Sequence, residues 1–317
     1  MDNDVIEKRQ KMKNTVFFGN GFNRSKNGMF SWEDLLNELA SPEKGFSNEF
    51  PNTMHYEYAV MKKLNNVIDL KEKEENIKQQ IANKMQKIEV NEMYEKLSRL
   101  NVENLITTNY DCTLKNTFLK NGCEHFTANT ESIYSIRRNT VIVNKKMNKT
   151  YKIWNIHGEI EAPKSIMLGL DHYCGSIGKI DDYIKGKYKF QTGNENIDVS
   201  AISEKINNES KEKYDKYSWI ELFFNSNIFI IGFGLDYSET DLWWILNQRV
   251  RMKNSSEFAG KINNNITFYD EVDYDKRRLL ESFGVEVIGK EVNQDWTDFY
   301  ESKIEDIDKL CTQDCLV

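Results

Sequence analysis

His157 is the residue of this sequence best suited to proton transfer, because it follows the alternating run 151–156 and precedes Gly158. An imidazole has an ordinary pKa of about 6.5, so it can accept a proton near neutral pH. The chain holds four histidines in all. A histidine in such a place also serves as a structural hydrogen-bond donor, and the sequence leaves both roles open.

A second polar group, Thr108, Asn109, Tyr110 and Asp111, follows the apolar run 102–107. Short polar side chains in succession suit a site that binds hydroxyl groups through hydrogen bonds. Asn109 or Asp111 would also serve as the N-cap of a following helix, since both types accept backbone N–H groups there.

Two Gly-x-Gly turns follow two further apolar runs. The first spans Gly19 to Asn23 after run 15–18, and the second starts at Gly232 after run 227–231. Glycine lets the backbone turn sharply and approach a phosphate closely, although a plain tight turn explains either motif alone. The usual dinucleotide fingerprint has a third glycine where this chain has Arg24, so a dehydrogenase is disfavoured.

These motifs need a scaffold that brings them together. We expect strands at the four apolar runs that precede the motifs and at 166–168, 266–269 and 285–288. We expect helices at 242–246 and 277–283. Alternating strands and helices predict an α/β, Rossmann-like fold with a mostly parallel sheet flanked by helices. Ligands bind beyond the carboxyl ends of such strands, so the four motifs are expected to meet at one edge.

The chain reads as one domain over residues 1–317, because it has only three prolines and no linker. A large helical insertion is expected at about 31–100. Ser31 and Asp34 form the capping box of its first helix, and a later helix has an apolar face of Ile77, Ile81, Met85 and Ile88. Smaller insertions are expected at about 120–150 and 170–220. A second capping box, Ser238 with Asp241, is expected to open the helix at 242–246.

Composition excludes several classes of protein. The 43 Lys and Arg against 50 Asp and Glu give a formal charge of −7, which disfavours direct nucleic-acid binding. Apolar runs are too short for a membrane span, and no signal peptide opens the chain. The five cysteines read as reduced thiols in a cytoplasm. Cys311 and Cys315 lack a second pair or a nearby histidine, so no metal site is predicted.

In their order and spacing the motifs resemble the sirtuin-like superfamily, particularly its bacterial phage-defence branch. Members of that family carry a Gly-Ala-Gly-x-Ser turn, a Trp-x-x-Leu helix start, Thr-Asn-Tyr-Asp, His-Gly, and a Gly-x-Gly loop before a helix with Asp. The matching segments here are 19–23, 32–35, 108–111, 157–158 and 232–241, and the resemblance covers roughly residues 14–290. Asn20 and Asn23 replace the small Ala and Ser. The first and last motifs also resemble a family of phage abortive-infection proteins.

The resemblance implies NAD glycohydrolysis, in which NAD is cleaved to nicotinamide and ADP-ribose, as part of an anti-phage defence system. It implies that His157 accepts a proton, Asn109 holds the ribose and a water, and Asp111 orients either group. The implied NAD contacts are Gly19, Asn20, Gly21, Phe22, Asn23, Trp32, Thr108, Asn109, Asp111, Gly232, Phe233, Gly234 and Asp241.

Two other functions stay open. An NAD-dependent protein deacylase uses the same cleavage, but its zinc module needs two cysteine pairs that are missing between His157 and Gly232. A non-catalytic module that senses NAD or ADP-ribose is disfavoured by the presence of both Asn109 and His157. A constitutive NADase would harm its host, so a homo-oligomer or a separate activating protein is expected as partner.

Overall fold

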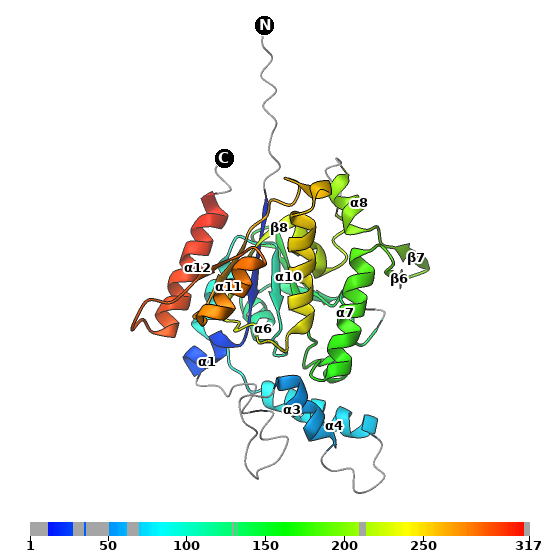
Figure 1. The fold of residues 1–317 in the computed structure, drawn as a ribbon. Helices are drawn as coiled ribbons and strands as arrows, with labels where there is room; N and C mark the ends of the chain where they lie inside the picture. The colour runs from blue at the N-terminus through cyan, green and yellow to red at the C-terminus, as the bar shows by residue number, and fades with distance from the viewer. Residues whose placement is uncertain are drawn as a thin grey trace.

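The computed structural model describes residues 12–27, 35, 51–61, 70–128, 130, 132–208 and 214–313. The predicted capping residues Ser31 and Asp34, the predicted NAD contact Trp32, and Cys315 lie outside this part of the chain. Eight strands form one sheet (Figure 1): β1 Lys13–Phe18, β2 Asn104–Thr107, β3 Glu124–Thr127, β4 Thr140–Asn144, β5 Lys149–Asn155, β8 Ser226–Ile231, β9 Ile266–Tyr269 and β10 Val285–Ile288.

The sheet runs in the order β10-β9-β8-β1-β2-β5-β4-β3, and its first six strands are parallel. Counted along the chain, these six strands stand in the order 6-5-4-1-2-3, which is the doubly wound order of dinucleotide-binding folds. The predicted Rossmann-like α/β fold is therefore confirmed. Strand order reverses between β1 and β8, and this is where such sheets bind ligands.

Helices cover both faces of the sheet, because successive strand residues point to opposite sides. Phe17, Ile106 and Trp154 face α7 (Leu170–Ile184) and α10 (Thr240–Lys253). On the other face the alternate strand residues pack against α5 (Glu92–Arg99), α6 (Thr113–Lys120) and α12 (Trp296–Gln313). Figure 1 shows α7 and α10 side by side on one face.

Several helices lie between β1 and β2: α1 (Gly21–Asn27), α3 (Asn52–Met61), α4 (Leu70–Met85) and α5. Figure 1 shows α3 and α4 beyond the end of the sheet at which β1 runs into α1. Tyr56 and Ile81 of these helices share a hydrophobic cluster with Tyr110, which follows β2, and with Leu168. The predicted apolar face is confirmed for Ile77, Ile81 and Met85, which are buried on α4.

The two smaller predicted insertions hold distinct structures. Segment 120–150 contributes β3 and β4, which pair antiparallel beside β5. Segment 170–220 contains α7, a hairpin of β6 (Lys189–Thr192) and β7 (Glu195–Asp198), α8 (Ile202–Asn207) and the short turn η2 (Trp219–Glu221). The remaining helices are α9 (Leu222–Asn225) and α11 (Tyr274–Ser282), with the short turns η1 (Pro163–Ser165) and η3 (Ser256–Phe258).

Two local predictions are wrong. Residues 166–168 form no strand, because Met167 bonds the His157 carbonyl while Ile166 and Leu168 enter the cluster under α3 and α4. The Ser238/Asp241 capping box does not form either: α10 begins at Thr240 with Glu239 as an N-cap that makes no side-chain cap bond. Ser238 bonds Asp236 instead, and Asp241 bonds other side chains. None of the described helices is long and apolar enough to cross a membrane.

Candidate active site

The four polar motifs begin side by side at the carboxyl edge of the sheet. Phe18, the last residue of β1, pairs with Ile231 of β8 and with Thr107 of β2, and Thr107 pairs with Asn155 of β5. Three motifs start at the residue after Phe18, Thr107 or Ile231, and His157 follows Asn155 by two residues. The expectation that the motifs meet at one edge is confirmed, since strand register alone aligns them.

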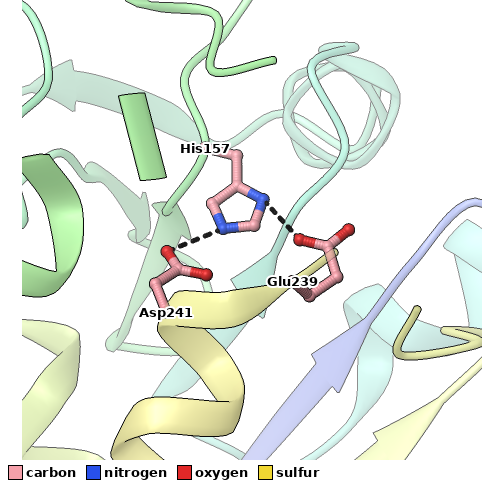
Figure 2. Close-up of side chains that lie close together, drawn as sticks. All are labelled: His157, Glu239 and Asp241. Carbon is pink, nitrogen blue, oxygen red and sulfur yellow. Dashed lines mark hydrogen bonds and ion pairs between the residues drawn. The ribbon is translucent and has the colours of Figure 1, made fainter. Parts of the chain in front are cut away.

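At this edge the imidazole of His157 lies between two carboxylates (Figure 2). Its Nε2 is 3.1 Å from Oδ2 of Asp241, and its Nδ1 is 3.5 Å from Oε2 of Glu239. His157 follows β5, whereas both acids follow β8, three places away in the sheet. At about 4.8 Å per strand, segment 232–241 therefore crosses roughly 14 Å of sheet edge to reach the histidine.

Helix α7 fixes both carboxylates. The Tyr173 hydroxyl donates to Oε2 of Glu239 at 2.9 Å, and the Ser176 hydroxyl donates to Oδ2 of Asp241 at 3.0 Å. Residues three apart lie on the same helix face, so one face of α7 reaches both acids. The Tyr173 ring also meets the His157 ring edge-on, with 5.3 Å between centroids.

Burial and charge oppose each other at His157, whose exposed fraction is only 1%. Burial lowers the pKa of His157, but the carboxylates of Asp241 and Glu239 outweigh it, and the pKa lies above the ordinary value. Burial raises the pKa of Glu239 to about 7, even though His157 opposes the rise. The two carboxylates therefore favour the protonated form of His157, and Glu239 is the group poised to exchange a proton near neutral pH.

The same three side chains also meet a geometric condition for metal binding. One ligand atom from each of His157, Glu239 and Asp241 lies within 4.8 Å of the others. The two acids, however, contact opposite ring nitrogens, and a metal-bound imidazole must give up a proton at one of them. The raised pKa of His157 resists that loss. The donor set fits an ion pair better than a metal centre.

We therefore expect purified protein to contain no stoichiometric zinc by elemental analysis. A bound structural ion stabilises the folded state, so EDTA is expected to leave the melting temperature unchanged. One zinc per chain, removed by EDTA with a lowered melting temperature, would contradict this prediction and favour a deacylase.

Asn109 and Asp111 belong to a second polar network, centred on the fully buried Asn23. Nδ2 of Asn23 donates to Oδ1 of Asn20 at 2.9 Å and to Oδ2 of Asp111 at 3.3 Å. Oδ1 of Asn23 accepts from the Tyr94 hydroxyl, which in turn accepts from Nδ2 of Asn109. Asp111 also accepts the backbone N–H of Thr113, but the N-cap residue of α6 is Cys112, so neither Asn109 nor Asp111 is the N-cap. Burial raises the pKa of Asp111.

The Thr-Asn-Tyr-Asp segment separates two clefts. Thr108 and Tyr110 line a cleft together with His157, Tyr173 and Glu239, and Asn52 and Thr53 of α3 complete its wall. Asn109 and Asp111 line a different cleft, whose other residues include Lys115 and Glu159. Asn109 and His157 meet at one sheet edge as expected, but they do not open into the same cleft.

The two glycine turns pack directly against each other. The N–H of Gly21 donates to the carbonyl of Gly232 at 2.8 Å, and that of Gly19 donates to Ile231 at 3.3 Å. A Cβ on Gly21 would stand 2.7 Å from the Gly232 Cα, so glycine is required by this contact alone. The Gly234 carbonyl accepts from Lys276. Phosphate binding by these turns stays a prediction.

Phe22 and Phe233, two predicted NAD contacts, serve the hydrophobic core. Phe22 packs edge-on against Tyr300, and Phe233 stacks on Phe17 at 5.0 Å between centroids. Asp241, a third predicted contact, is fully buried beneath His157. It supports the imidazole, and its position gives no direct route to a ligand.

Sequence reasoning missed Glu239, Tyr173, Ser176 and Tyr94. Glu239 had a signal, since it is an acid in the polar segment between a Gly-x-Gly turn and the next helix. Tyr173, Ser176 and Tyr94 gave none. They lie on helices whose docking on the sheet brings them to the site, and no spacing rule connects them to the strand ends.

Comparison with models of protein families gives a match that covers more than half of the chain. A family model described as a SIR2-like domain matches residues 103–288, which include β2 to β10 and the segments of Asn109, His157 and Glu239. The first glycine turn lies before the matched region. A search of curated proteins finds no match to the chain.

Proposed function

Because the chain belongs to the SIR2-like domain family, we propose that it is an NAD glycohydrolase that cleaves NAD to nicotinamide and ADP-ribose. Family membership by itself indicates only an NAD-related activity. The observation that carries the finer proposal is the buried Glu239–His157–Asp241 group at the ligand-binding edge of the sheet. It combines a proton acceptor with negative charge, and glycoside cleavage needs both.

The chemistry follows from the charge of the substrate. The nicotinamide of NAD is cationic, so the electron pair of the broken bond between ribose C1′ and nitrogen leaves with a neutral base. The ribose acquires oxocarbenium character, which nearby carboxylates stabilise. The oxygen of a water then bonds to C1′, and the Glu239 carboxylate accepts its proton. His157 stabilises the ionised form of Glu239, and Asp241 holds the imidazolium.

The neighbouring network completes the proposal. Asn109 holds a ribose hydroxyl in its own cleft, and Asp111 orients the network through Asn23. Thr108 contributes to the cleft of His157. The turns at Gly19 and Gly232 stand at the strand-order reversal, where phosphates of a dinucleotide bind in this class of sheet. A dinucleotide has two riboses, so one ligand can extend over both clefts.

Incubation of purified protein with NAD, followed by chromatography, tests the proposal. Nicotinamide and ADP-ribose should appear in equal amounts, and NADH should be a poor substrate because its dihydronicotinamide is an uncharged, poor leaving group. Equal cleavage of NADH would contradict the mechanism. Tight NAD binding without turnover would support the sensing module, whereas consumption of an acyl-lysine peptide would support the deacylase.

The rate of NAD cleavage is expected to rise with pH through about 7. Glu239 must be ionised to accept a proton, and burial raises its pKa from 4.5 to about 7, so the active form is lost as the pH falls below that value. Glu239→Gln should remove this rise of the rate near pH 7, called the pH step below, and lower kcat about 10²–10⁴-fold, the usual effect of losing a general base. A pH–rate profile of both proteins measures the change.

Glu221→Gln is the matched control. Glu221 is also a buried glutamate that accepts from a tyrosine hydroxyl, Tyr183, at 2.7 Å, but it lies in the core away from the sheet edge. Its variant should keep the pH step even if the melting temperature falls. An unchanged pH step in Glu239→Gln would refute the role of Glu239.

The biological setting is a further part of the proposal. NAD depletion by this enzyme would serve anti-phage defence, as the resemblance to that sirtuin-like branch implies. Its control would come from self-assembly or from a separate activating protein. The helices α3 and α4 beyond the sheet edge support this idea, because Asn52 and Thr53 of α3 wall the His157 cleft. A partner that moves α3 would change access to the cleft.

A further inference from the structure

The hydroxyl of Tyr94 joins helix α5 to the side chain of Asn109. Tyr94 is fully buried, and its hydroxyl donates to Oδ1 of Asn23 at 3.0 Å. The same oxygen accepts a hydrogen bond from Nδ2 of Asn109 at 3.4 Å. No residue of the proposed chemistry lies on α5, so the mechanism above leaves Tyr94 unexplained.

Hydrogen-bond logic fixes the direction of every group in this network. Oδ2 of Asp111 accepts from the amide nitrogen of Asn23, while its Oδ1 accepts the backbone N–H of Thr113. Oδ1 of Asn23 then faces Tyr94, which must donate its single proton there. The remaining lone pairs of Tyr94 only accept, so Asn109 must present Nδ2 to it. Oδ1 of Asn109 is thereby left for the cleft that this residue lines.

Packing keeps the tyrosine in place. Its ring meets Phe18 and Phe22 edge-on, at interplanar angles of 84° and 88°. Asn91, the N-cap residue of α5, donates from Nδ2 to the carbonyl of Phe22 at 3.1 Å. The start of α5 is thus tied to the first glycine turn, and the Tyr94 hydroxyl has little freedom to move.

We propose that Tyr94 is a positioning residue that orients the Asn109 amide so that its oxygen faces the substrate. An amide oxygen accepts a hydrogen bond from a ribose hydroxyl, and it places partial negative charge towards the ribose as positive charge develops on it. A flipped amide would present two N–H donors, which can do neither. This inference rests on the proposed NAD glycohydrolase activity.

Tyr94→Phe is the direct test, since it removes one oxygen and keeps the ring. The amide of Asn109 then loses its anchor, and kcat is expected to fall about 10–100-fold, as for a misplaced reacting group. KM for NAD should change less than about twofold, because the effect arises in the transition state. The pH step near 7 should stay, since Glu239 belongs to the other network.

Tyr183→Phe is the matched control for lost stability. Tyr183 is equally buried and also donates one hydrogen bond through its hydroxyl, to Glu221 in the core. It should lower the melting temperature without lowering kcat. In the background of Asn109→Ser, which keeps a small polar group and measurable activity, Tyr94→Phe should have no further effect on kcat, because two residues that act through one contact are not additive.

If the wild type cleaves NAD, three results would overturn the inference. The first is an unchanged kcat in Tyr94→Phe. The others are a fall in kcat of the same size in Tyr183→Phe, or a fall of the same size when Tyr94→Phe is added to Asn109→Ser. If the wild type fails to cleave NAD, the proposed function fails, but the orientation is still measurable. The side-chain amide resonance of Asn109, assigned by its loss in Asn109→Ser, should shift in Tyr94→Phe and not in Tyr183→Phe. An unshifted resonance would overturn the inference independently of activity.

Discussion

Replacement of His157 by glutamine is expected to lower the rate of NAD cleavage about 10²–10³-fold near neutral pH, the range for loss of one electrostatic stabiliser from an active site. Glutamine can still donate to Asp241 from its Nε2, but it carries no charge to stabilise the ionised Glu239. The pH step near 7 should therefore move upward, because the cation that opposes the raised pKa of Glu239 is gone. Single-turnover assays at several pH values measure both effects.

Alanine is a poor choice at this position. It would leave the fully buried Asp241 without its cation, and removal of one partner from a buried pair costs about 3–5 kcal/mol. Lost activity in that variant would not separate catalysis from unfolding. His172→Asn is the control, since His172 is another buried histidine and asparagine keeps the acceptor for the N–H groups of Leu168 and Gly169. Near-normal turnover in His157→Gln would make His157 a structural residue.

Asn109→Ala is expected to reduce kcat by about 10²–10³-fold, as when one stabilising dipole is removed from an active site. The protein should stay folded, because Asn109 makes one long side-chain hydrogen bond, to Tyr94 at 3.4 Å. Its loss should cost about 0.5–1.5 kcal/mol of unfolding free energy. Kinetics and thermal melts on the same preparation give both quantities.

Asn104→Ala is the matched control for this variant. Asn104 is a buried asparagine that begins β2, whereas Asn109 follows the end of that strand, and its Oδ1 accepts from the Trp154 indole at 3.0 Å. It should lose comparable stability and keep its activity. Equal activity losses in the two variants would assign Asn109 to the scaffold.

Much of the scaffold could be predicted from residue pattern. The strands at 266–269 and 285–288 match β9 and β10 residue for residue. Strands β1, β2, β5 and β8 differ by one or two residues at their starts, and β5 also ends one residue earlier than predicted. Apolar runs bounded by polar turns carry this information locally. The failed strand at 166–168 shows the limit, since its apolar residues are buried by helices and not by a sheet.

The alignment of the four motifs could also be predicted. Parallel strands end at one edge, so polar residues that follow them in the sequence become neighbours in space. A shared edge brings His157, Asn109 and both glycine turns together whatever the order of the strands. It does not assign their side chains to clefts, because that depends on how segment 108–111 leaves the sheet.

Residue pattern is therefore enough to assign the class of fold, the edge of the sheet that carries the candidate site, and His157 as a residue able to exchange a proton. The surroundings of that histidine follow only from how distant segments pack together. The path of segment 232–241 across β1 and β2 delivers Glu239 and Asp241 to it, and α7 docks Tyr173 and Ser176 on those acids. The pattern of apolar residues in a segment indicates how that segment is buried. A cluster of charged side chains and its pKa values depend instead on contacts between segments far apart in the chain.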